Sequence, residues 1–236
     1  MLEKYKTIGF AILGGIIPAL FWLWFWLREE DEKRTESALM IILTFILGGL
    51  LVFIAIWLER DSLNFIRDNT TQVIVWATIE ELLKVSGILL ILKSANVIRK
   101  PIDYPIYFIS IALGFAAIEN TLYLIQPIRV NGTVVGMLTG NLRFLGSTLL
   151  HAIASGMVGS AFGLSFYLHK HKIKYVTIGI TLAIVLHSTF NFFIMKGDNV
   201  NFMSVFGFLW VVVIINILIF EKIRCMGKPL LNYVTK

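Results

Sequence analysis

Charged residues, cysteine and proline are all scarce in this sequence. Of its 236 residues, 15% are charged and 57% are hydrophobic, whereas a soluble domain averages about 25% charged and about 45 to 50% apolar residues. The chain has five prolines and a single cysteine, Cys225, so no internal disulfide can form. These shortages exclude an ordinary soluble domain. They indicate a polytopic membrane protein, whose backbone polar groups must be satisfied within helices or a closed barrel.

Apolar runs of membrane-spanning length recur along the whole chain. A helix needs about 20 residues to cross the roughly 30 Å of hydrocarbon in a bilayer, and the runs are continuous, unlike the alternating segments of about ten residues in a barrel. We therefore predict an all-α fold, a polytopic transmembrane bundle of about seven helices forming a single integral membrane domain over residues 1–236. The predicted spans are Thr7–Leu27, Ser37–Trp57, Gln72–Leu92, Tyr104–Gln126, Leu142–Leu168, Lys174–Met195 and Phe202–Phe220.

The connections between these runs are too short for a soluble domain. The longest are Leu58–Thr71 and Pro127–Asn141. The first run follows a short basic start, MLEKYK, but it is longer than the apolar region of a signal peptide and lacks a small-residue cleavage site. We therefore keep it as a transmembrane helix and expect the protein to act within or at the edge of the bilayer.

The distribution of lysine and arginine predicts an orientation. With seven crossings, one side of the membrane carries thirteen of the 21 basic residues and the other side six, with Lys84 and Arg143 within helices or at their ends. The positive-inside rule then places the N-terminus outside and the C-terminus in the cytoplasm. The net charge of +6 is explained by loops that face anionic lipid, so the bilayer is the expected partner and nucleic acid is not.

A specific set of ionisable residues interrupts four successive apolar runs. Such residues are costly inside a membrane and usually functional. Four of them, one on each run, lie about seven to nine residues from the same end of the bundle (Glu80, Glu119, His151 and His187), which corresponds to a depth of roughly 10 to 14 Å at 1.5 Å per residue. Four helices are therefore expected to present acids and histidines in one layer. The residues are Glu80, Glu81 and Lys84 on the third run, Glu119 on the fourth, His151 on the fifth and His187 on the sixth.

Helical spacing adds local geometry to this layer. Glu80 and Lys84 are four residues apart, as are His187 and Asn191, so each pair shares a helix face. His151 is followed at four-residue intervals by Ser155, Gly159 and Gly163. A stripe of small residues lets neighbouring helices approach closely, so we expect His151 to point into the bundle.

Four motifs, in this order and on successive helices, carry a resemblance to a known family. They are EELLK (Glu80–Lys84), GFAAIENTLYL (Gly114–Leu124, with Phe115 and Glu119 as F-x-x-x-E), RFLGSTLLHA (Arg143–Ala152) and HSTFN (His187–Asn191). Together they resemble the PrsW family of intramembrane proteases, within the larger CAAX-protease and Abi superfamily. The resemblance covers residues 72–195, which we expect to form a four-helix catalytic core in a prokaryotic plasma membrane.

The resemblance implies peptide hydrolysis by a glutamate-activated water, with no cofactor. In this interpretation Glu80 is the general base and His151 helps to hold the water. His187 and Asn191 would donate hydrogen bonds to the carbonyl oxygen as it becomes an oxyanion. The supporting residues would be Glu81 and Glu119, which orient their neighbours, Lys84, which compensates nearby carboxylates, and Arg143, which is placed to orient a carboxylate.

The resemblance also points to a substrate class. Members of this family suggest site-1 cleavage of a single-pass anti-sigma factor, and other small membrane proteins are alternatives. CAAX-type members of the superfamily have arginine where this chain has Lys84, which disfavours a prenylated substrate.

Two other functions fit the same residues. Glu80, Glu119, His151 and His187 could supply the nitrogen and oxygen ligands of a zinc site, although the chain has no HExxH motif and Lys84 would oppose a cation. The same acids and histidines could instead form the relay of a proton-coupled transporter, but no internal repeat of the kind found in many transporters is apparent.

Overall fold

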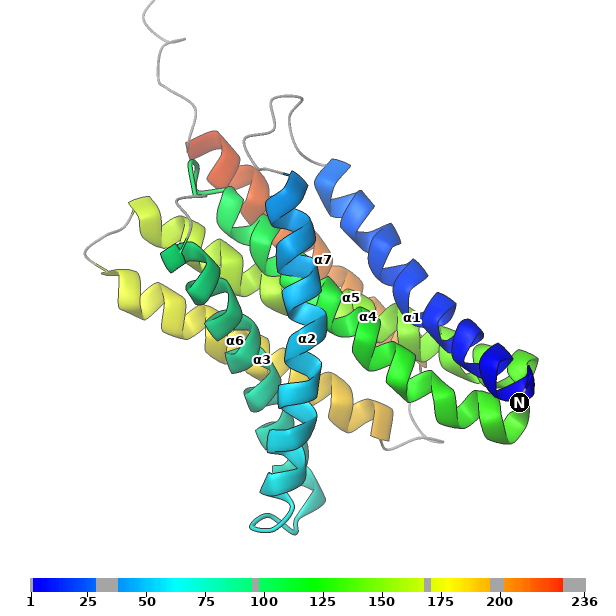
Figure 1. The fold of residues 1–236 in the computed structure, drawn as a ribbon. Helices are drawn as coiled ribbons and strands as arrows, with labels where there is room; N and C mark the ends of the chain where they lie inside the picture. The colour runs from blue at the N-terminus through cyan, green and yellow to red at the C-terminus, as the bar shows by residue number, and fades with distance from the viewer. Residues whose placement is uncertain (1, 29–37, 95–97, 168–170, 196–201, 227–236) are drawn as a thin grey trace, which may run out of the picture.

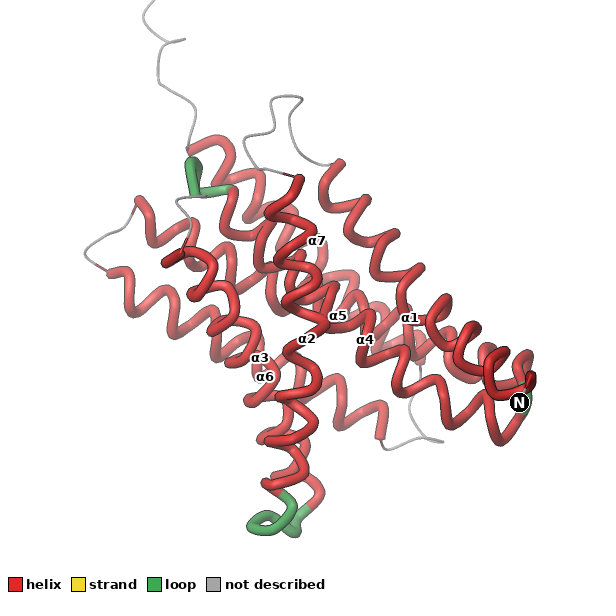
Figure 2. The backbone as a smooth tube through the Cα atoms, in the orientation of Figure 1, coloured by secondary structure: helices red, strands yellow, loops and turns green. Residues whose placement is uncertain are grey.

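The described part of the chain consists of helices joined by short turns and loops (Figures 1 and 2). A computed structural model describes all residues except 1, 29–37, 95–97, 168–170, 196–201 and 227–236. Within the described residues there is no strand, which confirms the all-α prediction. The helices are α1 (Leu2–Arg28), α2 (Ala38–Ser62), α3 (Asn69–Ser94), α4 (Asp103–Asn131), α5 (Thr133–Tyr167), α6 (Lys172–Met195) and α7 (Phe202–Met226).

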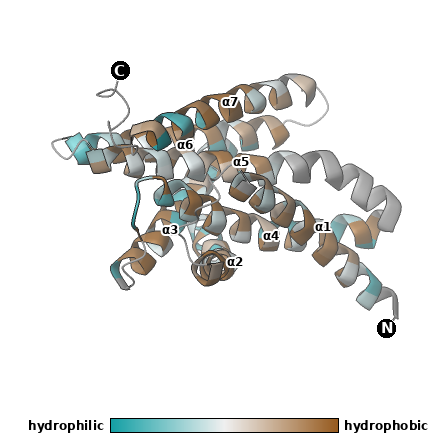
Figure 3. Ribbon diagram, turned by 90° about the horizontal axis from the view of Figure 1, so that it is seen from above, coloured by the Kyte–Doolittle hydropathy of each residue, from teal (hydrophilic) through white to brown (hydrophobic). Residues whose placement is uncertain are grey.

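Six of these helices are long and apolar enough to cross a membrane, and α3 is the exception. Its 26 residues are long enough, but Glu80, Glu81 and Lys84 lower the hydropathy of its central segment. The chain is thus a multi-pass membrane protein. Apolar residues predominate along α1, α2 and α7 in Figure 3.

One predicted connection is wrong. The segment Pro127–Asn141 was expected to be a loop, but α4 continues to Asn131 and α5 begins at Thr133. The two helices are separated by Gly132 alone, whose φ of 78° lies in the region that glycine reaches without steric cost. Pro127 lies inside α4 and does not end it.

Helices α4 and α5 form the centre of the bundle. In their most apolar windows 72% of α4 and 78% of α5 are buried, against 22% for α1 and α7. Helices α1 and α2 pack against α4, α6 packs against α5, and α3 lies beside α2 and α6 (Figure 1). The two central helices carry Glu119 and His151, and the other ionisable residues reach them from α3 and α6.

Helices α2 and α4 approach each other closely through glycine. A Cβ atom at Gly48 would collide with the carbonyl oxygen of Ile111, and one at Gly114 would collide with that of Phe45. Beside this contact the Ser110 hydroxyl donates to the carbonyl oxygen of Ile41 (2.8 Å). The pair is thus held by direct backbone packing, as small residues allow within membranes.

The small-residue stripe on α5 packs in a similar way. Gly159 faces Pro105 and Gly163 faces the carbonyl oxygen of Pro101, at the start of α4. This contact places His151, two turns before Gly159, in the interior of the bundle, where 1% of its surface is exposed.

Candidate active site

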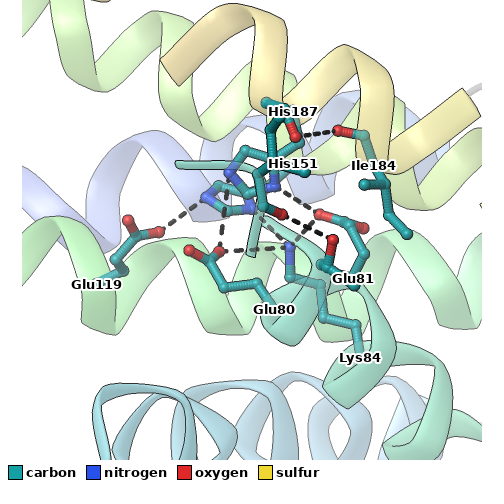
Figure 4. Close-up of polar contacts among 10 residues, drawn as sticks. Glu80, Glu81, Lys84, Glu119, His151, Ile184 and His187 are labelled. Carbon is teal, nitrogen blue, oxygen red and sulfur yellow. Dashed lines mark hydrogen bonds and ion pairs between the residues drawn. The ribbon is translucent and has the colours of Figure 1, made fainter. Parts of the chain in front are cut away.

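The site is built around a lysine that is almost completely buried. Lys84 on α3 is 1% exposed. Its Nζ lies 2.7 Å from Oε1 of Glu81 and 2.8 Å from Nδ1 of His151, and 3.9 Å from Oε2 of Glu80. Nζ also lies 4.8 Å from the centre of the Phe115 ring. Lys84 therefore joins α3 to α4 and α5 at one point (Figure 4).

Two histidines from different helices lie next to this lysine. The rings of His151 on α5 and His187 on α6 meet edge to face, with centroids 4.9 Å apart and planes at 85°. His187 Nδ1 lies 2.8 Å from Oε1 of Glu81, and His151 Nε2 lies 2.8 Å from Oε2 of Glu119. Four helices thus contribute to one connected network, which we call the Glu–His cluster: Glu80, Glu81, Lys84, Glu119, His151 and His187.

The hydrogen bonds assign the proton on each neutral ring. An ammonium group has donors and no acceptor, so His151 accepts from Lys84 at Nδ1 and donates its Nε2 proton to Glu119. His187 donates from Nδ1 to the carboxylate of Glu81, which leaves its Nε2 as an acceptor. That Nε2 lies 3.8 Å from Oε2 of Glu80, a buried oxygen that has no hydrogen-bond partner among the described residues. Two acceptor atoms therefore face each other.

The cluster holds three carboxyl groups and a single ammonium group. With all three carboxyl groups ionised and both imidazoles neutral, two negative charges would be uncompensated. Charges removed from water are expensive unless they are paired. The arrangement thus favours a cation, protons or polar ligand atoms next to Glu80.

The donor atoms are suited to a metal ion. Glu80, His151 and His187 each offer one ligand atom, and these atoms lie within 4.8 Å of one another. Two imidazole nitrogens and a carboxylate oxygen are a common set for zinc. His187 is held through its other nitrogen by Glu81, as metal-bound histidines usually are by a carboxylate. Lys84, weighed above against a cation, is compensated by Glu81 at 2.7 Å.

His151 is less ready to bind a metal than His187. Both of its ring nitrogens are engaged, one by Lys84 and the other by Glu119. Binding through Nε2 would displace the proton that this nitrogen gives to Glu119. The residues can therefore hold a divalent cation, with Glu119 adjacent, after a change in one hydrogen bond.

Two expected site residues are not part of this network. Asn191 lies one turn beyond His187 on α6, is half-buried, and makes no hydrogen bond to any described member of the cluster. Arg143 lies on α5 two turns before His151, but its side chain is outside the described residues. The supporting role of Arg143 and the oxyanion role of Asn191 remain predictions.

Sequence reasoning missed Glu59. The second apolar run was predicted to end at Trp57, but α2 continues to Ser62, which places Glu59 inside the helix. Its half-buried carboxylate interacts electrostatically with Glu119, Lys84 and Glu80. An acid in the last turn of an apolar helix was the available signal, and it resembled an ordinary helix end.

The members of the cluster differ in exposure. The side chains of Glu81, Lys84, His151 and His187 are 1 to 2% exposed, and that of Glu80 is 8% exposed. By contrast, the Glu119 side chain is 39% exposed. Glu119 is therefore the member of the cluster that is most accessible from outside.

Comparison with known proteins gives a consistent result. A family model described as PrsW family intramembrane metalloprotease matches residues 36–219. The chain is 28% identical over 189 residues to Protease PrsW of Clostridioides difficile, covering 78% of each chain. It is 30% identical over 188 residues to Protease PrsW of Oceanobacillus iheyensis, covering 78% of this chain and 82% of the relative. For Protease PrsW of Bacillus subtilis the identity is 28% over 210 residues, covering 85% and 91%. No solved structure gives a significant match.

Proposed function

Because this chain belongs to the PrsW family of intramembrane proteases, we propose that its Glu–His cluster hydrolyses a peptide bond in a membrane-tethered protein. The observation that carries the proposal is the state of Glu80. Its Oε2 is buried, has no hydrogen-bond partner in the part of the chain that the structure describes, and lies 3.8 Å from an acceptor nitrogen of His187. A water between two such acceptors is held by both and loses a proton readily to either.

In this mechanism Glu80 is the general base. It takes the proton from the attacking water and passes it to Nε2 of His187, 3.8 Å away. Protonated His187 then donates to the carbonyl oxygen or to the leaving nitrogen, so the proton removed from water returns to the product. Asn191, one turn further along α6, supplies the second donor to the oxyanion when substrate is present.

The remaining members of the cluster hold these groups in place. Glu81 accepts from Nδ1 of His187 and so keeps Nε2 as the acceptor. Lys84 donates to both Glu81 and His151, which fixes two of the four helices relative to each other. Glu119 accepts from His151 and holds the plane of that ring.

A zinc ion fits the same donor set. Glu80, His151 and His187 would hold it, with Glu119 adjacent. When bound, zinc would act as a Lewis acid toward water and the substrate carbonyl. The excess of carboxyl groups over ammonium groups in the cluster supports this version of the site. Activity without any added cation would support the version that uses Glu80 alone.

The substrate we propose is a single-pass membrane protein, with an anti-sigma factor as the leading candidate. Glu80 is nearer the start of α3 than its end, and Glu119 and His187 are nearer the ends of α4 and α6, so these residues lie nearer the membrane face at which α2 ends and α3 begins, which we call the site face. From the distribution of basic residues we propose that this face is extracytoplasmic and that the C-terminus is in the cytoplasm. Cleavage would therefore fall in or near the extracytoplasmic end of the substrate helix. The comparisons favour this hydrolysis over proton-coupled transport.

The test is cleavage of candidate single-pass proteins in cells that produce the wild type, Glu80→Gln, Glu81→Gln, His151→Ala or His187→Ala. We expect cleavage by the wild type and its loss in each variant, with protein amounts in the membrane unchanged. The purified enzyme is then assayed with a zinc chelator. Loss of activity that zinc restores assigns the metal-dependent mechanism, and resistance assigns the glutamate mechanism. Normal cleavage by all four variants would contradict the proposal.

A further inference from the structure

Glu59 lies opposite Glu80 in the antiparallel pair formed by α2 and α3. Two contacts fix the register: the indole nitrogen of Trp76 donates to the Ser62 hydroxyl (3.1 Å), and Gly87 packs against Leu47 and Leu51. Glu80 follows Trp76 by about one turn, and Glu59 precedes Ser62 by slightly less than one turn. The two carboxylates therefore lie at the same level.

The face of α2 that carries Glu59 points into the bundle. Val52 and Ala55, at seven and four positions before Glu59, are each 1% exposed, and residues at this spacing share a helix face. Glu59 itself is half-buried. It extends the buried face of α2 into the last turn of the helix, at the site face.

The charged groups at the site differ in exposure according to their sign. The positive group, Lys84, is 1% exposed. The more exposed groups are carboxylates: Glu119, whose side chain is 39% exposed, and the half-buried Glu59. Among the described residues neither side chain forms an ion pair with lysine or arginine. Both interact electrostatically with Glu80, whose Oε2 is buried and has no hydrogen-bond partner within the described part of the chain.

We propose that Glu59 is a specificity-determining residue that, with Glu119, binds a lysine or arginine side chain of the substrate close to the scissile bond. The inference rests on the hydrolytic function proposed above. A cleft lined by one sign of charge at a low-dielectric boundary concentrates groups of opposite charge. Lysine and arginine also have apolar stems long enough to cross the membrane boundary while the charged end reaches a polar site. A neutral or acidic residue at the same position would leave the carboxylates without a counter-charge.

The experiment uses a library of single-pass reporter proteins with a short randomised segment at the membrane boundary. The library is produced in cells with the full-length wild type, Glu80→Gln, Glu59→Gln, Glu59→Lys or Asp61→Asn, and the new N-termini are sequenced. Asp61 is the matched control, since it is an exposed acid in the same helix end. Three reporters that differ only in Lys, Gln or Glu at the selected position are then compared for KM and kcat in detergent.

The expected result is a preference of the wild type and Asp61→Asn for lysine or arginine near the cut. Glu59→Gln raises KM for the lysine reporter about tenfold or more, with kcat nearly unchanged, because a charge-assisted hydrogen bond to a carboxylate is replaced by a weaker one to a neutral amide. Glu59→Lys reverses the preference toward the glutamate reporter.

Two results would overturn the inference while the proposed hydrolytic function stands. Equal cleavage of the three reporters by the wild type means that the carboxylates of Glu59 and Glu119 do not select substrates. An equal fall of kcat for all three reporters in Glu59→Gln assigns Glu59 a structural role instead. If every reporter that is cut in cells with the wild type is also cut in cells with Glu80→Gln, no cleavage depends on Glu80. The proposed hydrolytic function itself then fails, and the inference fails with it.

Discussion

Helix α4 is packed in opposite ways on its two sides, and the change occurs between adjacent residues. Gly114 lies directly against the backbone of α2. Phe115, the next residue, faces Lys84 and His151. The centroids of the Phe115 and His151 rings are 5.7 Å apart. One side of α4 thus contacts the backbone of the apolar helix α2, whereas the other side contacts ionisable side chains from α3 and α5.

The backbone contacts that hold the bundle together thus lie on one side of α4, and the ionisable groups of the proposed active site lie on the other. Backbone packing at Gly48 and Gly114 leaves no space for rearrangement, so α4 presents Phe115 and Glu119 at fixed positions. The polar side depends on hydrogen bonds that a ligand can exchange. A change on the first side should therefore affect folding, and a change on the second should affect activity more than folding.

The largest effect is expected from Gly114→Leu. The new side chain meets the backbone of Phe45, which cannot move aside as a flexible side chain would, so the cost exceeds the roughly 1 to 3 kcal/mol of ordinary overpacking. Folded protein should be lost from detergent extracts, as measured by size-exclusion chromatography. Gly9→Leu is the control because its Cβ meets no atom within 4 Å. Equal yields of the two variants would refute the proposed packing.

A smaller loss of stability is expected from Lys84→Met. It leaves Glu81 and Glu80 buried without their ammonium partner, and removing one partner of a buried pair costs about 3 to 5 kcal/mol. The thermal midpoint in detergent should fall clearly. Lys93→Met, an exposed position in the last turn of the same helix, should leave it unchanged. A Lys84→Met protein as stable as the wild type would show that Lys84 serves chemistry alone.

His187→Ala should affect stability less and activity more. Truncation removes one hydrogen bond to Glu81, worth about 1.5 to 3 kcal/mol, but also the acceptor next to Glu80. General acid–base groups contribute about a hundredfold to ten-thousandfold in rate, so cleavage should fall by at least about a hundredfold. Ser188→Ala is the neighbouring control, since its hydroxyl donates to the backbone of Ile184. Retained cleavage in His187→Ala would remove this residue from the mechanism.

The smallest effect is expected outside the membrane, at Asp68. Its Oδ2 accepts from the backbone NH and the hydroxyl of Thr71 (2.8 and 2.7 Å) at the start of α3, and these hydrogen bonds hold the pKa of Asp68 below its usual 3.8. Because the pKa is lowered on folding, the stabilisation is present above pH 3.8 and is lost as the pH falls through the folded-state value. Asp68→Ala should lower the thermal midpoint slightly at neutral pH. A difference from wild type that persists undiminished in strong acid would contradict this assignment.

The sequence was sufficient to predict the helices, because continuous apolar runs specify them without tertiary information. It also predicted that Glu80, Glu119, His151 and His187 lie at one depth, since depth follows from residue counts along each helix. It could not predict which atoms meet. The contact of Lys84 with His151 depends on helix rotation, which is set by packing at residues such as Gly159 and Gly114.

Two departures have separate physical causes. The predicted loop between α4 and α5 is helical because one glycine with positive φ is enough to connect the two helices. Glu59 was missed because the end of α2 was judged from hydropathy alone, and a charged residue there resembles an ordinary boundary. Its relation to Glu80 became visible only when the register between α2 and α3 was known.

The low hydropathy of α3 also has a consequence for biosynthesis. On insertion scales, a charged residue at the centre of a helix costs about 2.5 to 3.5 kcal/mol, and α3 carries three such residues within one and a half turns. This helix would not leave the translocation channel for lipid on its own. It must enter together with α2, to which the short segment 63–68 joins it. Lys84 and Glu81 pair within α3, but the histidines that bind them are on α5 and α6, which are synthesised later. The Glu–His cluster is therefore complete only after the sixth helix has been inserted.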